Sequence, residues 1–342
     1  MIGTVFASRS PGIRDTGSDA IQQADRGIFM QMTTKPDWLR VKLPSSVPDM
    51  GPMQRIRERS LCTVCVEAHC PNQMECFQKG TATFMLLGPS CTRNCTFCAV
   101  GKERVIPADP MEPDRIAGAI SRMKIKYCVL TMVTRDDLQD GGASHIRQCV
   151  QAIRKRKPAI LLELLISDLA GKKESLDTVM ATTPNVLNHN IETVERLYPQ
   201  VRPQAEYGRS LELLDTASRY VQKPAVMKSG MMLGLGETRE EVLGTMDDLA
   251  KANCQILTLG QYLAPSPSHY PVHDYVHPDE FAFYEEEAQQ RGFLAVASSP
   301  LVRSSYNAED LYYQARHAGE HFDIDDKKAK KDNGNRPSLR NR

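Results

Sequence analysis

Three cysteines stand within eight residues, at Cys91, Cys95 and Cys98. A structural zinc site usually takes four ligands and builds them from paired two-residue spacings. This C-x3-C-x2-C array instead offers three thiols, which suit a four-iron cluster in which one iron has no protein ligand. Because an open iron can chelate a small molecule, the array predicts a catalytic cluster. A zinc knuckle and three unrelated core thiols are the alternatives at this point.

A second set of cysteines lies upstream, at Cys65, Cys70 and Cys76, with Cys62 in front of it. Its spacing is C-x4-C-x5-C, so two independent three-cysteine arrays indicate two clusters. Six of the ten cysteines fall between Cys65 and Cys98. Such uneven placement in a long chain argues against a secreted disulfide scaffold, and it indicates metal ligation in a reducing compartment.

Composition excludes several classes of function. The chain has 342 residues and a formal net charge of +1, so bulk electrostatics favours neither nucleic acid nor a membrane surface. The strongest apolar run, from Ile160 to Ile166, is far shorter than a membrane span and contains Glu163. A chain of this length can bury a large core.

Apolar runs alternate with amphipathic segments along the middle of the chain, which predicts parallel strands joined by helical crossovers. Six such units are too few for a full eight-stranded barrel, so we expect a partial barrel. Polar groups follow several strands, at the strand ends where barrels gather their chemistry. The expected strands are Thr83–Leu87, Tyr127–Met132, Ile160–Ile166, Asn185–Asn190, Val226–Leu233 and Gln255–Gln261.

The chain divides into five expected segments. The first is rich in Ser, Gly, Asp and Gln, and its aspartates argue against an organellar presequence. The last is charged and has little to bury. The segments are a disordered leader over 1–40, an extension with the second cysteine set over 41–80, the partial barrel over 81–265, a C-terminal extension over 266–320 and a disordered charged tail over 321–342.

Over roughly residues 35 to 318 the chain resembles the lipoyl synthase family of the radical S-adenosylmethionine superfamily. The Cys91–Cys98 array alone marks the superfamily, while the upstream array and the late Arg-Ser-Ser-Tyr mark the family. The matching stretches are Thr63-Val64-Cys65 through Glu75-Cys76-Phe77, Gly80 to Met85, Cys91 to Cys98, Arg135 to Leu138, Asp140-Gly141-Gly142, Asn188-His189-Asn190, Gly234 to Glu237, Leu259 to Leu263 and Arg303 to Tyr306. The resemblance implies an α/β fold, a partial (βα)6 TIM-type barrel with N-terminal and C-terminal extensions.

The resemblance also implies two 4Fe–4S clusters and S-adenosylmethionine as cofactors. Cys91, Cys95 and Cys98 would hold the cluster that binds S-adenosylmethionine, whose reductive cleavage gives methionine and a 5′-deoxyadenosyl radical. Expected contacts to S-adenosylmethionine come from strand ends and from the loop itself. They are Phe97, Arg135, Glu163, Asn188, Asn190, Gly230, Gly234 and Glu237. The alternative for Glu163 is a barrel-interior carboxylate satisfied by its neighbours.

Cys65, Cys70 and Cys76 would hold the auxiliary cluster, with Ser305 as an oxygen ligand to its fourth iron. An alkoxide suits cluster iron less well than thiolate, which fits a cluster that is dismantled for its sulfur. From the residues alone, Ser304 and Ser305 are better interpreted as caps of a helix that begins near Asn307, and only the resemblance favours the ligand role.

Cys62 departs from the family pattern and is expected to be a bystander. The remaining cysteines fall inside predicted elements, where a free thiol commonly behaves as a small buried hydrophobe. They are Cys128, Cys149 and Cys254.

The implied activity is insertion of two sulfur atoms at carbons six and eight of an octanoyl chain linked to a lysine of a carrier protein. Implied partners are lipoyl domains of 2-oxoacid dehydrogenases, the glycine-cleavage H protein, a flavodoxin- or ferredoxin-type electron donor and an iron–sulfur carrier for cluster repair. We expect a cytoplasmic monomer without nucleic-acid or membrane partners, or a mitochondrial matrix protein if the leader is a presequence. Two rival interpretations are a biotin-synthase-like or methylthiotransferase enzyme and a zinc-binding interaction protein.

Overall fold

The computed structural model describes residues 35–40, 63, 72, 76, 81–123, 125–220 and 225–319. Contacts divide the chain into residues 1–40 and 41–342. In the first unit the described part holds one 3-10 turn, Asp37–Leu39. The predictions for residues 1–34 and for the tail over 321–342 lie outside the described residues, as do Cys62, Cys65 and Cys70.

A single sheet of seven parallel strands forms the centre of the second unit. The strands lie side by side in chain order, so each crossover returns the chain to the same end of the sheet. Their bounds are β1 Thr81–Leu86, β2 Tyr127–Met132, β3 Leu161–Leu165, β4 Val186–Asn188, β5 Val226–Leu233, β6 Ile256–Gln261 and β7 Ala295–Ser298.

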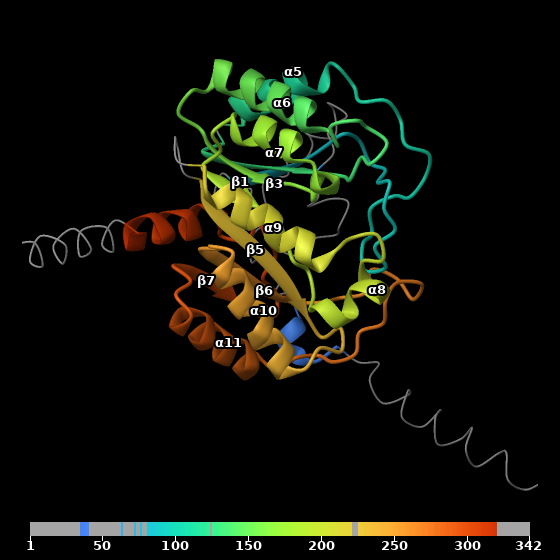
Figure 1. Cartoon of the computed structure of the whole chain (residues 1–342), viewed down its shortest axis with the longest axis vertical. Coiled ribbons are helices and arrows are strands. Elements are labelled where there is room, and N and C mark those ends of the chain that lie inside the picture. The colour runs from blue at the N-terminus through green and yellow to red at the C-terminus, as the bar shows by residue number, and fades with distance from the viewer. Residues whose placement is uncertain are drawn as a thin grey trace, which may run out of the picture. The chain divides into compact units, whose positions relative to one another are not determined.

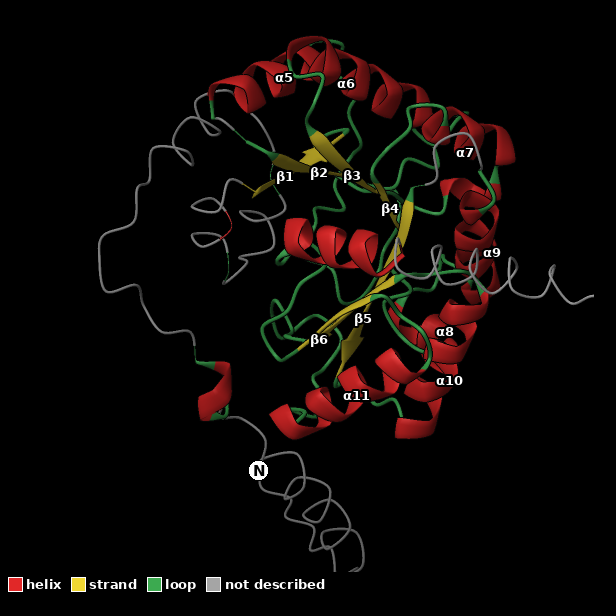
Figure 2. Cartoon of the chain, turned by 90° about the vertical axis from the view of Figure 1, so that its left-hand side faces the viewer, coloured by secondary structure: helices red, strands yellow, loops and turns green. Residues whose placement is uncertain are grey.

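Helices form an arc around the outside of the curved sheet (Figures 1 and 2). Two further 3-10 turns, Leu169–Gly171 and Glu195–Leu197, follow β3 and β4. The labelled helices are α5 Glu112–Arg122, α6 Ala143–Arg156, α7 Lys173–Met180, α8 Tyr198–Val201, α9 Tyr207–Ser218, α10 Arg239–Lys251 and α11 Pro278–Gln290. In the described part of the chain no helix is both long and apolar enough to cross a membrane.

Packing and capping explain why these helices form where they do. The α6 residues Ile146, Cys149, Val150 and Ile153 share one face and are all buried against the sheet. Burying each aliphatic side chain is worth about 1.5–3 kcal/mol, which outweighs the weak helix propensity of these β-branched residues. At α10, Thr238 forms a capping box with the third helical residue, which fixes where the helix begins.

All six expected strands are present; Tyr127–Met132 and Val226–Leu233 have the expected bounds, and the other four have shifted ends. The first strand ends at Leu86 instead of Leu87, because Leu87 has a φ of +70° and cannot continue the strand. The seventh strand, β7, was not predicted. It has only four residues, mostly small, and it pairs with β6 from Ile256↔Ala295 onward. A strand this short leaves almost no periodic signal in the sequence.

A helix over residues 308–319 lies at the end of the barrel where the strands begin: Leu311 and Ala315 are buried in one cluster with Val186, Val226, Ile256 and Ala295, the first residues of β4 to β7. Ala308 packs against Tyr127 and Val129 of β2, and the rings of Tyr127 and Tyr312 lie 6.4 Å apart. The predicted Arg303–Tyr306 motif directly precedes this helix. Packing of the helix against β2 therefore anchors the motif at the inside of the barrel.

Candidate metal centre

The loop that carries Cys91, Cys95 and Cys98 follows β1 at the carboxyl edge of the sheet. Since all strands are parallel, the segments after β2 to β6 end at the same edge. The expected gathering of polar groups around the cysteine loop is therefore confirmed. All three thiols are free and half-buried.

The chemistry of the donor set fits a cluster better than a single ion. Burial, together with the neighbouring Cys95 and Cys91, raises the pKa of the Cys98 thiol to about 11. The three sulfurs thus lie near one another, yet in the described residues they do not form a group within 4.8 Å. Thiolates around one zinc ion would lie about 3.8 Å apart, given Zn–S bonds of about 2.3 Å. Ligands spread more widely suit the several irons of a cluster.

Residues between the cysteines tie the loop to surrounding elements. Thr92 donates its amide to Thr134 O at 3.0 Å, and its hydroxyl accepts from the amide of Asp136 at 3.1 Å. On the other side, Thr96 donates its amide to Val201 O in α8 at 3.0 Å and accepts from the amide of Tyr270 at 2.9 Å. The loop is therefore held from both flanks without any contribution from its thiols.

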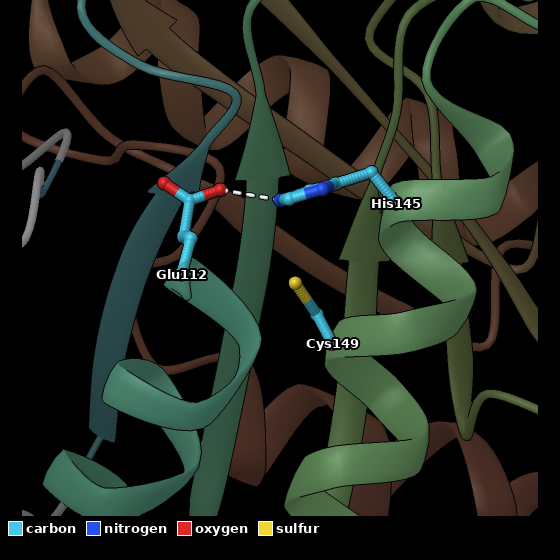
Figure 3. Close-up of side chains that lie close together, drawn as sticks. All are labelled: Glu112, His145 and Cys149. Carbon is cyan, nitrogen blue, oxygen red and sulfur yellow. Dashed lines mark hydrogen bonds and ion pairs between the residues drawn. The ribbon is translucent and has the colours of Figure 1, made fainter. Parts of the chain in front are cut away.

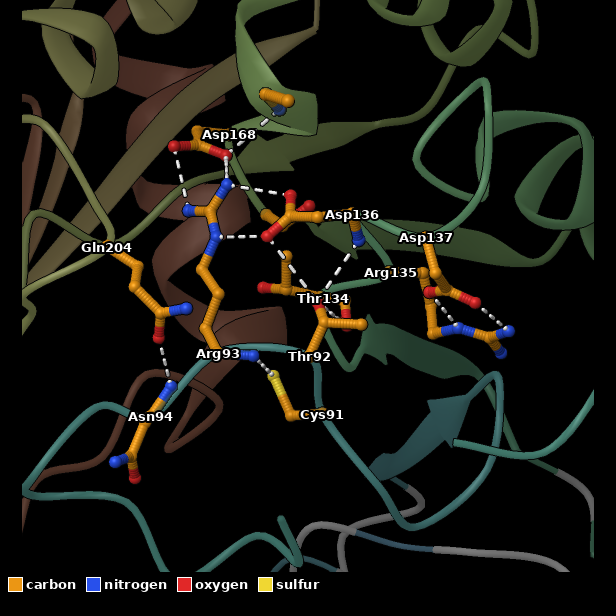
Figure 4. Close-up of polar contacts among 12 residues, drawn as sticks. Cys91, Thr92, Arg93, Asn94, Thr134, Arg135, Asp136, Asp137, Asp168 and Gln204 are labelled. Atoms are coloured by element: carbon orange, nitrogen blue, oxygen red, sulfur yellow. Dashed lines mark hydrogen bonds and ion pairs between the residues drawn. The ribbon is translucent and has the colours of Figure 1, made fainter. Parts of the chain in front are cut away.

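Arg93 is buried at the centre of this anchoring network (Figure 4). Its guanidinium donates to Asp136, which follows β2, and to Asp168, which follows β3. The two carboxylates raise the pKa of Arg93, and Arg93 in turn lowers the pKa of Asp168 to about 2 despite its burial. Sequence reasoning missed this residue's role, although its place between two predicted ligands was a signal.

Glu192 and Arg202 are two further residues that the sequence did not single out. Burial raises the pKa of Glu192, and Arg202 opposes that shift. Arg202 is close enough to Cys95 to lower the pKa of its thiol, against the larger effect of burial. Arg202 Nη1 donates to the carbonyls of Asn190 and Ile191, whereas its Nε is buried without a partner in the described residues. Arg202 is thus a buried cation with a spare donor near Cys95.

Two of the predicted glycines are required by close packing. A Cβ on Gly230 would lie 2.6 Å from Thr258 Oγ1 and 3.1 Å from Ser304 Oγ. Gly234 has a φ of +93°, and a Cβ there would lie 2.2 Å from Asp274 O. Glu237 accepts hydrogen bonds from the amides of Gly234 and Leu235, so its carboxylate closes the turn between β5 and α10.

Glu163 lies in a fully buried polar cluster inside the barrel. Lys228 Nζ is 3.0 Å from its Oε1, and both side chains are 0% exposed. Tyr127 Oη donates to Glu163 Oε2 at 2.7 Å, and Asn188 Nδ2 donates to Oε1 at 2.8 Å. These contacts support the alternative of a barrel-interior carboxylate satisfied by its neighbours. Asn188 Oδ1, in contrast, is buried without a partner in the described residues.

The C-terminal motif meets β4 and the upstream cysteine segment. Ser304 Oγ accepts from Asn190 Nδ2 at 2.7 Å, so its hydroxyl is engaged away from the first turn of helix 308–319. Asn72, between Cys70 and Cys76, donates to Leu301 O at 2.7 Å. Ser305 is half-buried, three residues before the helix begins. Of the predicted auxiliary cysteines, only Cys76 is described.

Arg135 and Phe97 complete the expected contacts. Arg135 is buried and donates through Nε and Nη2 to Asp137, each at 2.8 Å. Phe97 is half-buried and packs against the core cluster that includes Leu235 and Tyr262. Cys128, Cys149 and Cys254 are buried core thiols, as predicted.

Glu112, His145 and Cys149 form a second group of metal-binding residue types, with ligand atoms within 4.8 Å of one another (Figure 3). The group is buried between α5 and α6. Glu112 Oε2 already contacts His145 Nε2 at 2.6 Å and accepts from the Leu87 amide at 3.0 Å. Both contacts engage Oε2, so Glu112 joins His145 of α6 to the chain after β1.

A family model described as the Radical SAM superfamily matches residues 85–249. A curated lipoyl synthase from Chlorobium phaeovibrioides is 53% identical over 280 residues, covering 81% of this chain and 98% of the relative. One from Stutzerimonas stutzeri is 49% identical over 311 residues, covering 90% of this chain and 95% of the relative. Streptococcus suis SuiB bound to S-adenosylmethionine, at 12% identity and a TM-score of 0.52, shares the fold over 66% of this chain and 54% of its own.

Proposed function

The chain belongs to the lipoyl synthase family of the radical S-adenosylmethionine superfamily, and we propose that its Cys91–Cys98 loop is the centre of that activity. As a lipoyl synthase it inserts two sulfur atoms at carbons six and eight of a protein-bound octanoyl group, using S-adenosylmethionine and 4Fe–4S clusters. An unactivated methylene has no acidic proton and no leaving group, so polar catalysis cannot functionalise it. The bound cluster and S-adenosylmethionine supply the radical chemistry, while the protein binds and orients the reactants and excludes water.

Cys91, Cys95 and Cys98 would be the protein ligands of the first cluster. The observation that carries this proposal is a three-thiol loop, anchored through its non-cysteine residues and placed at the carboxyl edge of a parallel sheet. A loop held in this way leaves its sulfurs available for iron. It also keeps the fourth iron position free of protein donors from within the array.

Arg202 and Asn188 are suited to S-adenosylmethionine itself. The buried Arg202 Nε can donate to a carboxylate, and the buried Asn188 Oδ1 can accept from an ammonium or a hydroxyl group. Both atoms lack a partner among the described residues, and buried polar atoms are normally paired. Gly230 would allow the close approach of a ligand to β5.

Cys65, Cys70, Cys76 and Ser305 would hold the auxiliary cluster, which we propose to be the sulfur donor. Support comes from the hydrogen bond between Asn72 and Leu301, because it ties the cysteine segment to the chain just before Arg303. Ser304 is engaged by Asn190, which leaves Ser305 as the serine of the motif that is offered to a metal.

Lipoyl-domain proteins are the substrates and an electron donor is required. We propose the lipoyl domains of 2-oxoacid dehydrogenases and the glycine-cleavage H protein as the specific substrates. A flavodoxin- or ferredoxin-type protein would supply electrons, and an iron–sulfur carrier would rebuild the auxiliary cluster. The proposed state is a cytoplasmic monomer, since thiols and clusters of this kind are kept in reducing compartments.

Mass spectrometry of an octanoylated lipoyl-domain peptide tests the proposed function. The peptide is incubated anaerobically with reconstituted protein, S-adenosylmethionine and a reductant. We expect a product that has gained two sulfur atoms, together with methionine and 5′-deoxyadenosine. A peptide that keeps its mass while S-adenosylmethionine is cleaved would show another radical enzyme. Protein that stays colourless after reconstitution would support the zinc-binding alternative.

A further inference from the structure

We propose that Arg93 is a positioning residue that holds the Cys91–Cys98 loop in its ligand-ready shape before any iron is bound. The inference rests on the proposed function, because it assumes that this loop receives a cluster. In this proposal one buried side chain, that of Arg93, fixes the positions of three thiols that do not hold one another in place.

The geometry of Arg93 is that of a clamp between two strand ends. Its Nε and Nη2 donate to Asp136 at 2.8 and 2.9 Å, and its Nη1 and Nη2 donate to Asp168 at 2.9 and 2.6 Å. The Arg93 side chain is 5% exposed and that of Asp168 is 0% exposed. One guanidinium therefore fixes the loop to the segments after both β2 and β3 (Figure 4).

Asp168 is itself held in place, so the clamp has a rigid base. Its Oδ1 accepts from the amide of Ala170 at 3.1 Å, and its Oδ2 lies 3.3 Å from Arg209 Nη1 of α9. Arg209 also forms an ion pair with Glu206 at the start of the same helix. The network thus connects the cysteine loop with β2, β3 and α9.

The position of Arg93 in the loop transmits this restraint to the ligands. It stands two residues after Cys91 and two before Cys95. Its own amide donates to Cys91 Sγ at 3.4 Å, so the side-chain clamp and the thiol belong to one rigid turn. Holding a site in its bound geometry removes the ordering cost that binding would otherwise carry.

Lysine cannot replace arginine here. A guanidinium presents five donors in a flat fork and can pair with two carboxylates at once, whereas an ammonium is a single point charge. Arg93→Lys would keep the charge, yet it would leave one of Asp136 and Asp168 poorly paired. The variant therefore separates the fork geometry from the charge.

Arg291 supplies a matched control. It also joins two carboxylates, with Nε 2.7 Å from Asp247 and Nη1 2.6 Å from Glu287, and its side chain is 21% exposed. It links α10 to α11 and makes no described contact with the cysteine loop. Arg291→Lys thus carries the same substitution at an arginine bridge remote from the thiols.

The test compares apo-protein of the wild type, Arg93→Lys and Arg291→Lys by hydrogen–deuterium exchange and by the rate of iron uptake during anaerobic reconstitution. We expect exchange in a peptide over residues 90–99 to rise about tenfold or more in Arg93→Lys, which is the effect of losing about 1.4 kcal/mol of local stability. Iron uptake at the loop should slow by a similar factor. Arg291→Lys should match the wild type in both measurements.

Wild-type exchange and uptake in folded Arg93→Lys, or an equal change in Arg291→Lys, would overturn the inference. If Arg93→Lys does not fold, Asp136→Asn decides, because the Asp136 side chain is 36% exposed and asparagine keeps one acceptor oxygen. We expect several-fold faster loop exchange in Asp136→Asn, and unchanged exchange would count against the clamp. Wild-type protein that takes up no iron at the loop would refute the proposed function instead, while loop exchange in the apo-protein would still test the clamp.

Discussion

Replacing Lys228 by methionine should destabilise the protein by leaving Glu163 buried without its cation. The two groups lie 3.0 Å apart with both side chains fully buried. At an effective dielectric constant of about 20 their attraction is about 5.5 kcal/mol, but most of it offsets the cost of burying two charges. Removing one partner of such a pair typically costs about 3–5 kcal/mol.

The lower end of this range applies here, because Tyr127 and Asn188 still donate to Glu163. A loss of about 3 kcal/mol corresponds to a fall in melting temperature of roughly 6–12 °C for a protein of this size class. The assay is thermal unfolding of anaerobic apo-protein followed by circular dichroism. Glu163→Gln should also be destabilised, since it leaves Lys228 charged and poorly paired.

The double variant, Lys228→Met with Glu163→Gln, provides the control. It removes both charges, so it should recover most of the stability that either single variant loses. If Glu163 contacts S-adenosylmethionine directly, the double variant will regain stability but bind S-adenosylmethionine weakly. If Glu163 only supports the barrel interior, the double variant will regain both its stability and its binding of S-adenosylmethionine. Lys228→Met that melts within about 2 °C of the wild type would refute the reasoning, because such a shift is under about 1 kcal/mol.

Three further predictions follow from buried groups. His189 is fully enclosed between Ile166 O and Ser210 Oγ, and burial lowers its pKa to about 4, so the unfolded state takes up a proton first as the pH falls. The stability that comes from keeping His189 neutral should therefore be complete above about pH 6.5 and be lost as the pH falls from about 6.5 to 4. Urea unfolding should show a smaller difference in the free energy of unfolding between pH 7 and pH 5 in His189→Gln than in the wild type. Gly230→Ala should lower the free energy of unfolding by about 1–3 kcal/mol, because the added methyl group overpacks against Thr258. Adding Thr258→Ala should restore part of that loss, as measured by thermal unfolding. Maleimide should label the half-buried loop thiols of native apo-protein faster than Cys128, Cys149 and Cys254, which are at most 5% exposed. Equal labelling rates in peptide mass spectrometry would contradict the described core.

Much of the barrel was accessible from the sequence because its strands carry long apolar runs. The run from Tyr127 to Met132 is predicted and observed with the same bounds, since five consecutive buried residues leave a strong signal. Parallel order then brings the segments after each strand to one edge, so Cys91 and Thr134 could be placed near each other without a structure. β7 was not predicted because its four residues, which are mostly small, do not form a long apolar run.

Side-chain partners were harder to infer than positions. Asp168 has no motif around it, and its pairing with Arg93 depends on how β3 ends relative to the cysteine loop. Glu163 was expected to contact S-adenosylmethionine, with a barrel-interior carboxylate as the alternative. Its partners come from β2, β4 and β5, and such long-range contacts leave no periodic trace in the sequence. Glu237 was expected near a cofactor, and the structure adds its bonds to the amides of its own turn.

Isotopic labelling of the protein's own cluster sulfur tests whether the auxiliary cluster donates the sulfur of the lipoyl product. Protein reconstituted with heavy sulfide is given octanoylated lipoyl-domain peptide, S-adenosylmethionine and a reductant in unlabelled buffer, and the product is weighed by mass spectrometry. We expect lipoyl product that carries two heavy sulfur atoms, at most one product per chain without repair proteins, and none from the variant with Cys91, Cys95 and Cys98 all replaced by Ala. Product that contains light sulfur, or product from the triple variant, would contradict this expectation.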